Sequence, residues 1–172
     1  AVALRNSQTL FPPVFDSKQL TAKKRLELND ALMNNPDFIV SIAEIHPEEI
    51  DRINILNATH KAMANALSKL TGIEFALVDG LPVKGLPCPH KPIVKGDSKS
   101  ALIAAASIIA KVHRDQIMMR YSEIYPQYGF DKHKGYGTKE HVESIRKFGP
   151  SPIHRKSFEP IKNLLNSDDL FL

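Results

Sequence analysis

Short apolar segments alternate with long helix-forming segments along this chain of 172 residues. Four short runs rich in apolar and β-branched side chains predict strands, at residues 1–4, 38–43, 75–78 and 93–94. Four longer runs with capping residues, proline starts or helical apolar spacing predict helices, at residues 22–34, 47–70, 98–125 and 139–148. Within the first of these helices, Leu26, Ala31 and Leu32 are expected to face the core. Strands that alternate with helices indicate an α/β fold, in which helices pack on a sheet.

The cysteine content and the lack of long apolar runs limit the class of protein. Cys88 is the single cysteine, so an internal disulfide and a zinc site built on several cysteines are excluded. No run approaches the roughly 18 apolar residues of a membrane span, and the first residues lack a secretory signal pattern. We therefore expect a soluble protein of the reducing cytoplasm, and the length predicts a single domain.

Positive charge is concentrated in one part of the chain. Residues 84–157 contain 14 Lys and Arg against 6 Asp and Glu, a net charge of +8. Such a basic segment suits a polyanion such as nucleic acid, because each neutralised phosphate releases condensed counterions. A solvated basic surface without a ligand remains the alternative.

Asp79 is the first candidate for a functional residue. It ends the predicted strand at residues 75–78 and is followed by Gly80. Ligands of open α/β sheets gather at the carboxyl ends of strands, so a carboxylate there is well placed to hold a metal ion. The alternative is a turn residue, since Asp-Gly is also an ordinary hairpin signal.

Asp97 is the second candidate, and it lies just before the longest predicted helix. Aspartate is a preferred N-cap residue, so capping alone would explain its position. A carboxylate at a helix amino terminus also stays ionised, while the neighbouring Lys95 and Lys99 are available for phosphates.

A loop predicted at residues 127–137 contains a third candidate, Tyr136. The tyrosine stands between two glycines and among lysines and a histidine. An aromatic ring in such a loop can stack on a base or sugar while the cations follow the backbone. The alternative is a flexible surface turn with a packed tyrosine. The histidines include no His-x-x-x-His pair, and Cys88 with His90 is too small a ligand set for zinc.

Taken together, these segments resemble bacterial type 2 ribonuclease H, the ribonuclease HII family. Four of the matching motifs are Val78-Asp79-Gly80, Lys95-Gly96-Asp97-Ser98, His133-Lys134-Gly135-Tyr136-Gly137-Thr138 and Gly149-Pro150. The other matching pieces are residues 16–20, 49–56, 104–115 and 154–158. They follow one another in the family's order, and the ordered set is far more specific than any one piece.

The resemblance implies a ribonuclease H-like fold, in which helices flank a mixed five-stranded sheet. Residues 1–172 would be one catalytic domain, with residues 138–172 as its helical C-terminal extension. The resemblance also implies an endonuclease that cuts the RNA strand of RNA–DNA hybrids and nicks DNA 5′ of an embedded ribonucleotide, using Mg²⁺ or Mn²⁺. No obligate protein partner is implied, and a monomer is expected.

The family's site residues are only partly present in this sequence. Asp79 and Asp97 match two of the family's four carboxylates, Tyr136 matches its stacking tyrosine, and Lys18 and Lys99 are expected to contact phosphates. The other two carboxylates belong to an Asp-Glu-x-Gly-Arg-Gly motif on the first, central strand, which this sequence does not contain. We therefore expect an incomplete ribonuclease HII whose first strand precedes this chain.

This difference leaves more than one hypothesis open. Two-metal hydrolysis needs ions roughly 3.5 to 4 Å apart, and two carboxylates supply too few oxygen ligands for both ions. The first hypothesis is a metal-dependent endonuclease that needs the upstream motif. The second is a non-catalytic remnant that binds nucleic acid, and the third is a fragment without a stable fold.

Overall fold

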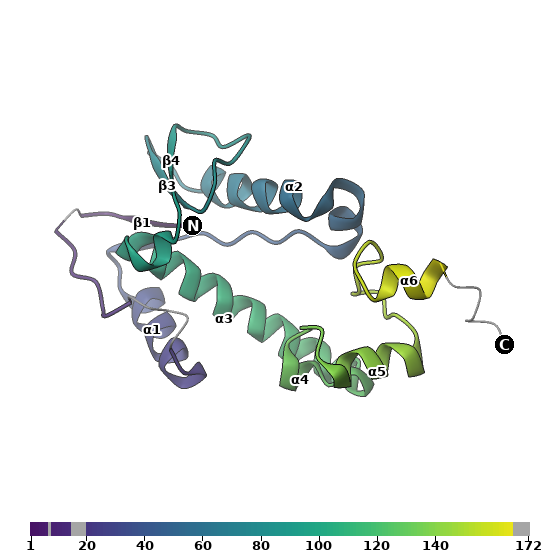
Figure 1. The fold of residues 1–172 in the computed structure, drawn as a ribbon. Coiled ribbons are helices and arrows are strands. Elements are labelled where there is room, and N and C mark those ends of the chain that lie inside the picture. The colour runs from purple at the N-terminus through teal and green to yellow at the C-terminus, as the bar shows by residue number, and fades with distance from the viewer. Residues whose placement is uncertain (7, 15–19, 167–172) are drawn as a thin grey trace. The chain divides into compact units, whose positions relative to one another are not determined.

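The computed structural model describes residues 1–6, 8–14 and 20–166, and the chain divides into two compact units. The first unit contains residues 1–44 and 59–113, and the second contains residues 45–58 and 114–172. Two helices pass from one unit to the other, α2 (Pro47–Ser68) and α3 (Ala101–Ile124) (Figure 1). No helix in the described ranges is long and apolar enough to cross a membrane.

The first unit contains two pairs of strands. β1 (Val2–Leu4) pairs antiparallel with β2 (Phe38–Val40), with Ala3 opposite Ile39. β3 (Ala76–Asp79) pairs in parallel with β4 (His90–Ile93). The strands lie where the sequence predicts them, within three residues at each end, and helices accompany them. The predicted α/β class, with mixed strand directions, is confirmed.

Helix α1 (Ala22–Asn34) has the bounds that the sequence predicts. It begins after Thr21, whose hydroxyl accepts a hydrogen bond from the Lys24 amide at 3.2 Å, as an N-cap residue does. The expected inward face was partly wrong: Leu32 is buried as expected, but Leu26 is 46% exposed, Ala31 is also exposed, and Leu28 is buried instead. Leu26 lies about 200° around the helix from Leu28, so the two leucines cannot face the same core.

The core of the first unit forms where α1 and β2 meet the amino-terminal part of α3. Ala104, Ala105 and Ile108 of α3 are fully buried there, together with Leu32 of α1 and Val14. The two alanines have small side chains, so they permit a close approach of the helix backbone to its neighbours. The alanine run of the sequence therefore has a packing role.

We expect Ile108→Ala to lower the free energy of unfolding by about 2 to 5 kcal/mol, because it leaves a cavity in this core. Urea titration followed by circular dichroism measures the change. Leu10→Ala is the matched control, since Leu10 is 88% exposed and its truncation should change stability by less than about 0.5 kcal/mol. Equal effects of the two substitutions would contradict the assigned core.

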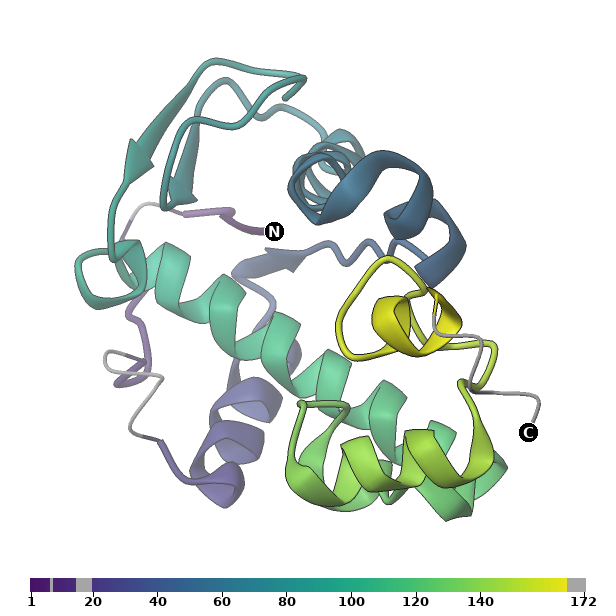
Figure 2. The same ribbon diagram turned by 45° about the vertical axis from the view of Figure 1, so that its right-hand side comes forward.

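The second unit is helical. It contains the 3-10 helix η2 (Pro126–Tyr128) and the helices α4 (Phe130–His133), α5 (Lys139–Phe148) and α6 (Ile161–Asn166) (Figure 2). α5 has its predicted bounds and begins after the N-cap residue Thr138. The predicted loop at residues 127–137 instead contains two short helical turns, because Tyr128 and Phe130 are buried in the unit's core.

Candidate functional site

Asp79 is the last residue of β3, and its side chain is exposed. The Gly80 amide donates to the Ile93 carbonyl at 2.9 Å, and Gly80 has a φ of +91° that turns the chain away from the strand. The hairpin alternative for Asp79-Gly80 is wrong, because β3 and β4 run parallel and are joined by a longer connection. Asp79 thus stands at the carboxyl end of a parallel strand, where α/β proteins place their ligands.

Asp79 reaches across to the segment that contains Asp97. Its Oδ1 atom accepts a hydrogen bond from the backbone amide of Gly96 at 2.8 Å. Asp79 therefore contacts Gly96, the residue directly before Asp97. Gly96 has little free space, since a Cβ atom there would lie 2.6 Å from Cδ1 of Ile103 and 3.3 Å from Oδ1 of Asp79. A glycine permits this close approach between the strand end and the turn.

Asp97 lies in the 3-10 helix η1 (Gly96–Ser98), and its side chain is only 6% exposed. Helix α3 begins at Ala101, three residues later than the sequence predicts. The capping alternative is therefore wrong for α3, because Asp97 lies four residues before its first residue. The η1 turn places Asp97 directly after the amide that Asp79 binds.

The two lysines next to Asp97 have different arrangements. Lys95 has a left-handed backbone with φ of 56°. The ammonium group of Lys99 donates to the Val94 carbonyl at 2.8 Å while its side chain remains exposed. This bond holds the positive charge of Lys99 on the turn that carries Asp97. Lys18, the other predicted phosphate contact, lies outside the described residues.

The oxygen donors of Asp79 and Asp97 are of the kind that Mg²⁺ and Mn²⁺ prefer. No group of three or more His, Cys, Asp or Glu side chains is arranged to hold a metal ion in residues 1–6, 8–14 and 20–166. Two carboxylates, with water completing the coordination, suit one divalent ion, since Mg²⁺ in proteins usually keeps several waters. The residues present therefore fit part of the site that the resemblance implies.

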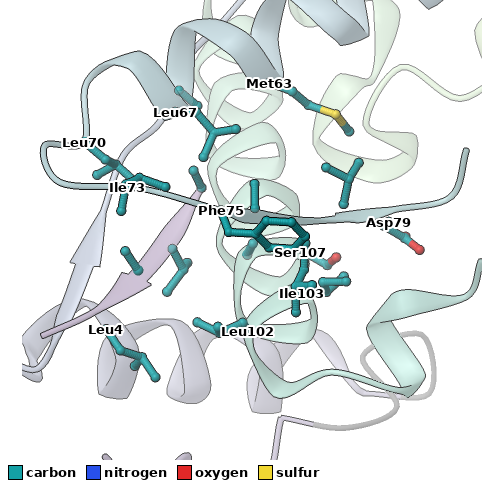
Figure 3. A pocket seen from close by; sticks show the side chains of 18 of the residues that line it. Leu4, Met63, Leu67, Leu70, Ile73, Phe75, Asp79, Leu102, Ile103 and Ser107 are labelled. Atoms are coloured by element: carbon teal, nitrogen blue, oxygen red, sulfur yellow. The ribbon is translucent and has the colours of Figure 1, made fainter. Parts of the chain in front are cut away.

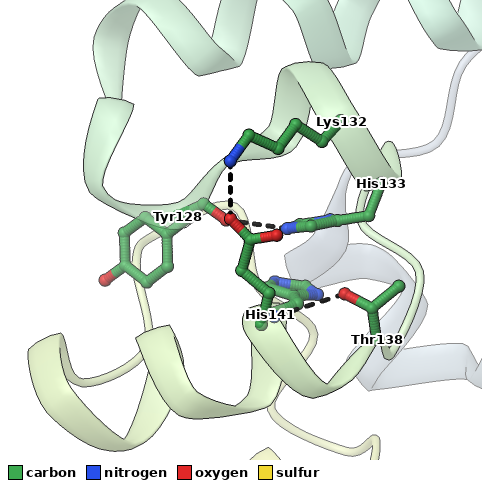
Figure 4. A network of polar contacts seen from close by, with 6 residues as sticks. Tyr128, Lys132, His133, Thr138 and His141 are labelled. Atoms are coloured by element: carbon green, nitrogen blue, oxygen red, sulfur yellow. Dashed lines mark hydrogen bonds and ion pairs between the residues drawn. The ribbon is translucent and has the colours of Figure 1, made fainter.

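Tyr136 lies in the second unit, between α4 and α5, and is 57% exposed. Its backbone is well held, because its amide donates to the His133 carbonyl at 2.9 Å and its carbonyl accepts from the Thr138 amide at 2.8 Å. Figure 4 shows the start of α5, where the Thr138 hydroxyl accepts from the His141 amide. The ring is not packed in a core, which contradicts the alternative of a buried structural tyrosine.

A pocket that the sequence did not reveal lies in the first unit. Its volume is about 570 Å³, and its mainly apolar lining comes from residues 1–4, the end of α2, residues 72–79 and the amino-terminal half of α3. Figure 3 shows apolar side chains of α2 and α3 on its walls and Asp79 at one end. Both β1 and β3 line it, and each has a strand partner on only one side within the described part of the chain.

Comparisons with known proteins identify related sequences over most of the chain. A family model described as "Ribonuclease HII" matches residues 9–161. A ribonuclease HII from Chlamydia pneumoniae is 54% identical over 157 residues, which are 90% of this chain and 72% of the relative. One from Clostridioides difficile is 49% identical over 167 residues, 96% of this chain and 64% of the relative.

Solved structures show the same fold. The crystal structure of the ribonuclease H2 from Pyrococcus horikoshii matches with a TM-score of 0.69 and 24% identity, over 90% of this chain and 81% of that one. The ribonuclease HII in a complex with PCNA from Archaeoglobus fulgidus matches with a TM-score of 0.68 and 23% identity, over 85% and 78% of the two chains.

Proposed function

This chain belongs to the ribonuclease HII family of nuclease hydrolases, and we propose that it supplies part of the catalytic site for cutting RNA–DNA hybrids and for nicking DNA 5′ of an embedded ribonucleotide. The observation that carries the proposal is the hydrogen bond from the Gly96 amide to Asp79. It joins the carboxyl end of a parallel strand to the turn that contains Asp97. The bond supports this assignment, because it places the Asp79 carboxylate next to the residue before Asp97.

Asp79 and Asp97 are the residues that would hold a divalent cation, Mg²⁺ or Mn²⁺. When bound, such an ion activates a water molecule and stabilises the leaving oxygen of a phosphodiester. The Gly96 amide keeps the Asp79 carboxylate in one orientation, because its hydrogen bond leaves less rotational freedom to the side chain. A two-ion mechanism requires further oxygen ligands, which we assign to the family's Asp-Glu-x-Gly-Arg-Gly motif.

Substrate contacts are assigned to basic and aromatic side chains. Tyr136 is exposed and can stack at the ribonucleotide, while Lys99 and Lys18 are assigned to phosphates. The excess of Lys and Arg in residues 84–157 supports electrostatic binding of a nucleic-acid backbone. We further propose that residues 1–172 act as one catalytic domain, as a monomer in the cytoplasm, in removing ribonucleotides from DNA.

The decisive experiment is cleavage of a labelled DNA duplex that carries one ribonucleotide, with Mg²⁺ or Mn²⁺ present. We expect a version extended upstream by the Asp-Glu-x-Gly-Arg-Gly strand to cut on the 5′ side of the ribonucleotide. If the extended version leaves both this duplex and an RNA–DNA hybrid intact, the proposed activity is wrong.

A non-catalytic nucleic-acid-binding role is the second candidate, and it is favoured by the presence of only two of the four family carboxylates. In this case the chain should bind duplexes in the presence of chelator, with an affinity that falls steeply as salt rises. Metal-dependent cleavage by the 172-residue chain would refute this alternative.

We expect Tyr136→Ala to weaken the preference for a duplex with one ribonucleotide over an all-DNA duplex more than it weakens overall affinity. Stacking of a base on an aromatic ring contributes about 1 to 3 kcal/mol, so the preference should fall by roughly 5-fold to 150-fold. Competition binding in chelator measures it. Phe148→Ala is the control, since Phe148 is a 49% exposed aromatic residue outside the loop. An unchanged preference in the Tyr136→Ala variant would show that Tyr136 is not part of the site.

A further inference from the structure

Three histidines of the second unit are buried beside residues 134–138, the Tyr136 loop that joins α4 to α5. His133 of α4, His141 of α5 and His154 are 8%, 5% and 8% exposed. The rings of His133 and His141 stack, as Figure 4 shows, and their centroids are 4.4 Å apart. The ring centroids of His141 and His154 are 5.3 Å apart. None of them belongs to the carboxylate pair or to the proposed phosphate contacts.

The hydrogen bonds of His154 and His141 determine where each ring carries its proton. The Ser151 amide, which can only donate, lies 2.9 Å from Nδ1 of His154, so this nitrogen accepts and carries no proton. A neutral His154 therefore has its proton on Nε2, which lies 3.0 Å from Nε2 of His141 and donates to it. His141 must then be protonated at Nδ1.

The proton on Nδ1 of His141 points at the Tyr136 loop. This nitrogen lies 3.0 Å from the Tyr136 carbonyl oxygen and donates to it. The three hydrogen bonds therefore all point the same way: the Ser151 amide donates to His154, His154 donates to His141, and His141 donates to the Tyr136 carbonyl. The Ser151 hydroxyl also lies 2.7 Å from Nδ1 of His154, so the hydroxyl and the amide of Ser151 share the single lone pair of this nitrogen.

His133 fixes the other side of the same loop. The Gly135 amide lies 3.2 Å from Nδ1 of His133, so this nitrogen accepts, and Nε2 donates to the Tyr128 carbonyl at 2.8 Å. Gly135 and Tyr136 are thus each bonded to a histidine, Gly135 to His133 and Tyr136 to His141. Gly135 has a φ of +78°, and an added Cβ would lie 3.1 Å from Cε of Met118, so a glycine suits this position in the loop.

The neutral histidines that this series of hydrogen bonds requires are favoured at neutral pH. Burial, together with the neighbouring His141, lowers the pKa of His154 to about 4, and burial also lowers the pKa of His141. The titratable groups that contact or electrostatically affect these rings include the three histidines themselves, Tyr128 of η2 and Glu140 of α5. Lys132 and Glu140 pair with each other at 2.8 Å on the surface.

We propose that Ser151, His154 and His141 form a directional hydrogen-bond relay that positions Tyr136 for the recognition of a ribonucleotide. His141 and His154 are positioning residues, because they act through the Tyr136 backbone. The relay deepens the proposed function and rests on the role assigned there to Tyr136. A second proton on the ring of His141 or His154 removes a hydrogen-bond acceptor from the relay. The relay therefore holds the Tyr136 loop only while both histidines are neutral.

The test begins with a measurement that needs no substrate. ¹⁵N NMR of the histidine side chains, on the chain at pH 7, should show His154 protonated at Nε2 and His141 protonated at Nδ1. As pH falls, the Tyr136 backbone signals should shift in step with the titration of His154, near its pKa of about 4. A proton on Nε2 of His141, or Tyr136 signals indifferent to the His154 titration, would overturn the relay.

Variants then connect the relay to recognition. His154→Asn keeps an oxygen that can accept from the Ser151 amide but has no donor that reaches His141. We expect it to lower the preference for a single-ribonucleotide duplex about fivefold, the effect of one hydrogen bond, with an unchanged salt dependence of binding. His46→Asn, at an exposed histidine of the same unit, should leave the preference unchanged.

The two proposals fail in different ways. One result would contradict the positioning role of His154. In it the tautomers are as stated, Tyr136→Ala abolishes the preference for a ribonucleotide, and a folded His154→Asn variant keeps that preference in full. If the unsubstituted chain and its upstream-extended version show no preference for a ribonucleotide, the role of Tyr136 in the proposed function fails. The tautomer measurement then still decides whether the relay exists.

Discussion

Asp79→Asn is expected to abolish metal-dependent cleavage by the chain extended with the family's upstream motif, while hybrid binding stays largely intact. Asparagine has nearly the same shape and retains an oxygen that can accept from the Gly96 amide, as Asp79 Oδ1 does at 2.8 Å. The substitution therefore removes the negative charge and preserves the local structure. A neutral amide is a poor ligand for a divalent cation compared with a carboxylate.

The loss of activity should exceed about 100-fold, because substitution of groups that only orient metal ligands already costs about 10- to 100-fold. The measurement is kcat on a labelled duplex with one ribonucleotide, together with hybrid affinity in chelator. Asp30→Asn, at an exposed carboxylate of α1, is the matched control and should leave both quantities unchanged. A large loss of hybrid affinity with normal turnover would contradict the role assigned to Asp79.

The second large effect is expected when a β-strand is supplied to the pocket of the first unit. β1 and β3 line this pocket, and each has a strand partner on only one side within the described ranges. Unpaired strand edges offer backbone donors and acceptors to an added strand. We expect a peptide with alternating apolar residues that ends in Asp-Glu-x-Gly-Arg-Gly to bind there and to restore cleavage.

Binding of the peptide should stabilise the chain by about 2.7 kcal/mol at a concentration 100 times its Kd, seen as a higher thermal transition. Two control peptides separate folding from catalysis. A peptide with Asn and Gln in place of Asp and Glu should stabilise the chain without restoring cleavage. A peptide with proline within the strand should do neither, because proline cannot donate to a strand partner.

A variant of the chain provides the complementary control. Ala106 of α3 lines the pocket, and Ala106→Phe would fill part of the space that the peptide needs. We expect this variant to lose the stabilisation by the peptide. Stabilisation and cleavage that persist in a folded Ala106→Phe chain would show that the peptide binds elsewhere.

Local signals in the sequence were sufficient for several features of this protein. Helices α1 and α5 have their predicted bounds, because the N-cap residues Thr21 and Thr138 bond to amides within the same turn. Asp79 and Asp97 were chosen as candidates for their positions at a strand end and before a helix. Such signals depend only on neighbouring residues, so they can be recognised without the tertiary structure.

Other features depend on contacts between distant parts of the chain. The sequence did not show that Asp79 would bind the amide of Gly96, because the bond forms only when β3 and β4 align in parallel. Leu26 and Leu28 are chemically alike, and only the placement of α1 against the core decided that Leu28 is buried and Leu26 exposed.

The histidines show the same division between local and distant information. The sequence shows that the histidines include no His-x-x-x-His pair, and it assigns no role to His133, His141 or His154. Their burial and their bonds to Ser151, Tyr128 and Tyr136 arise from the packing of α4, α5 and the segment that follows α5. The sequence thus determined the family, the starts of α1 and α5 and the candidate carboxylates. The tertiary structure alone decided that Asp79 meets the Gly96 amide and that the three histidine rings pack together, because these contacts join separate secondary-structure elements.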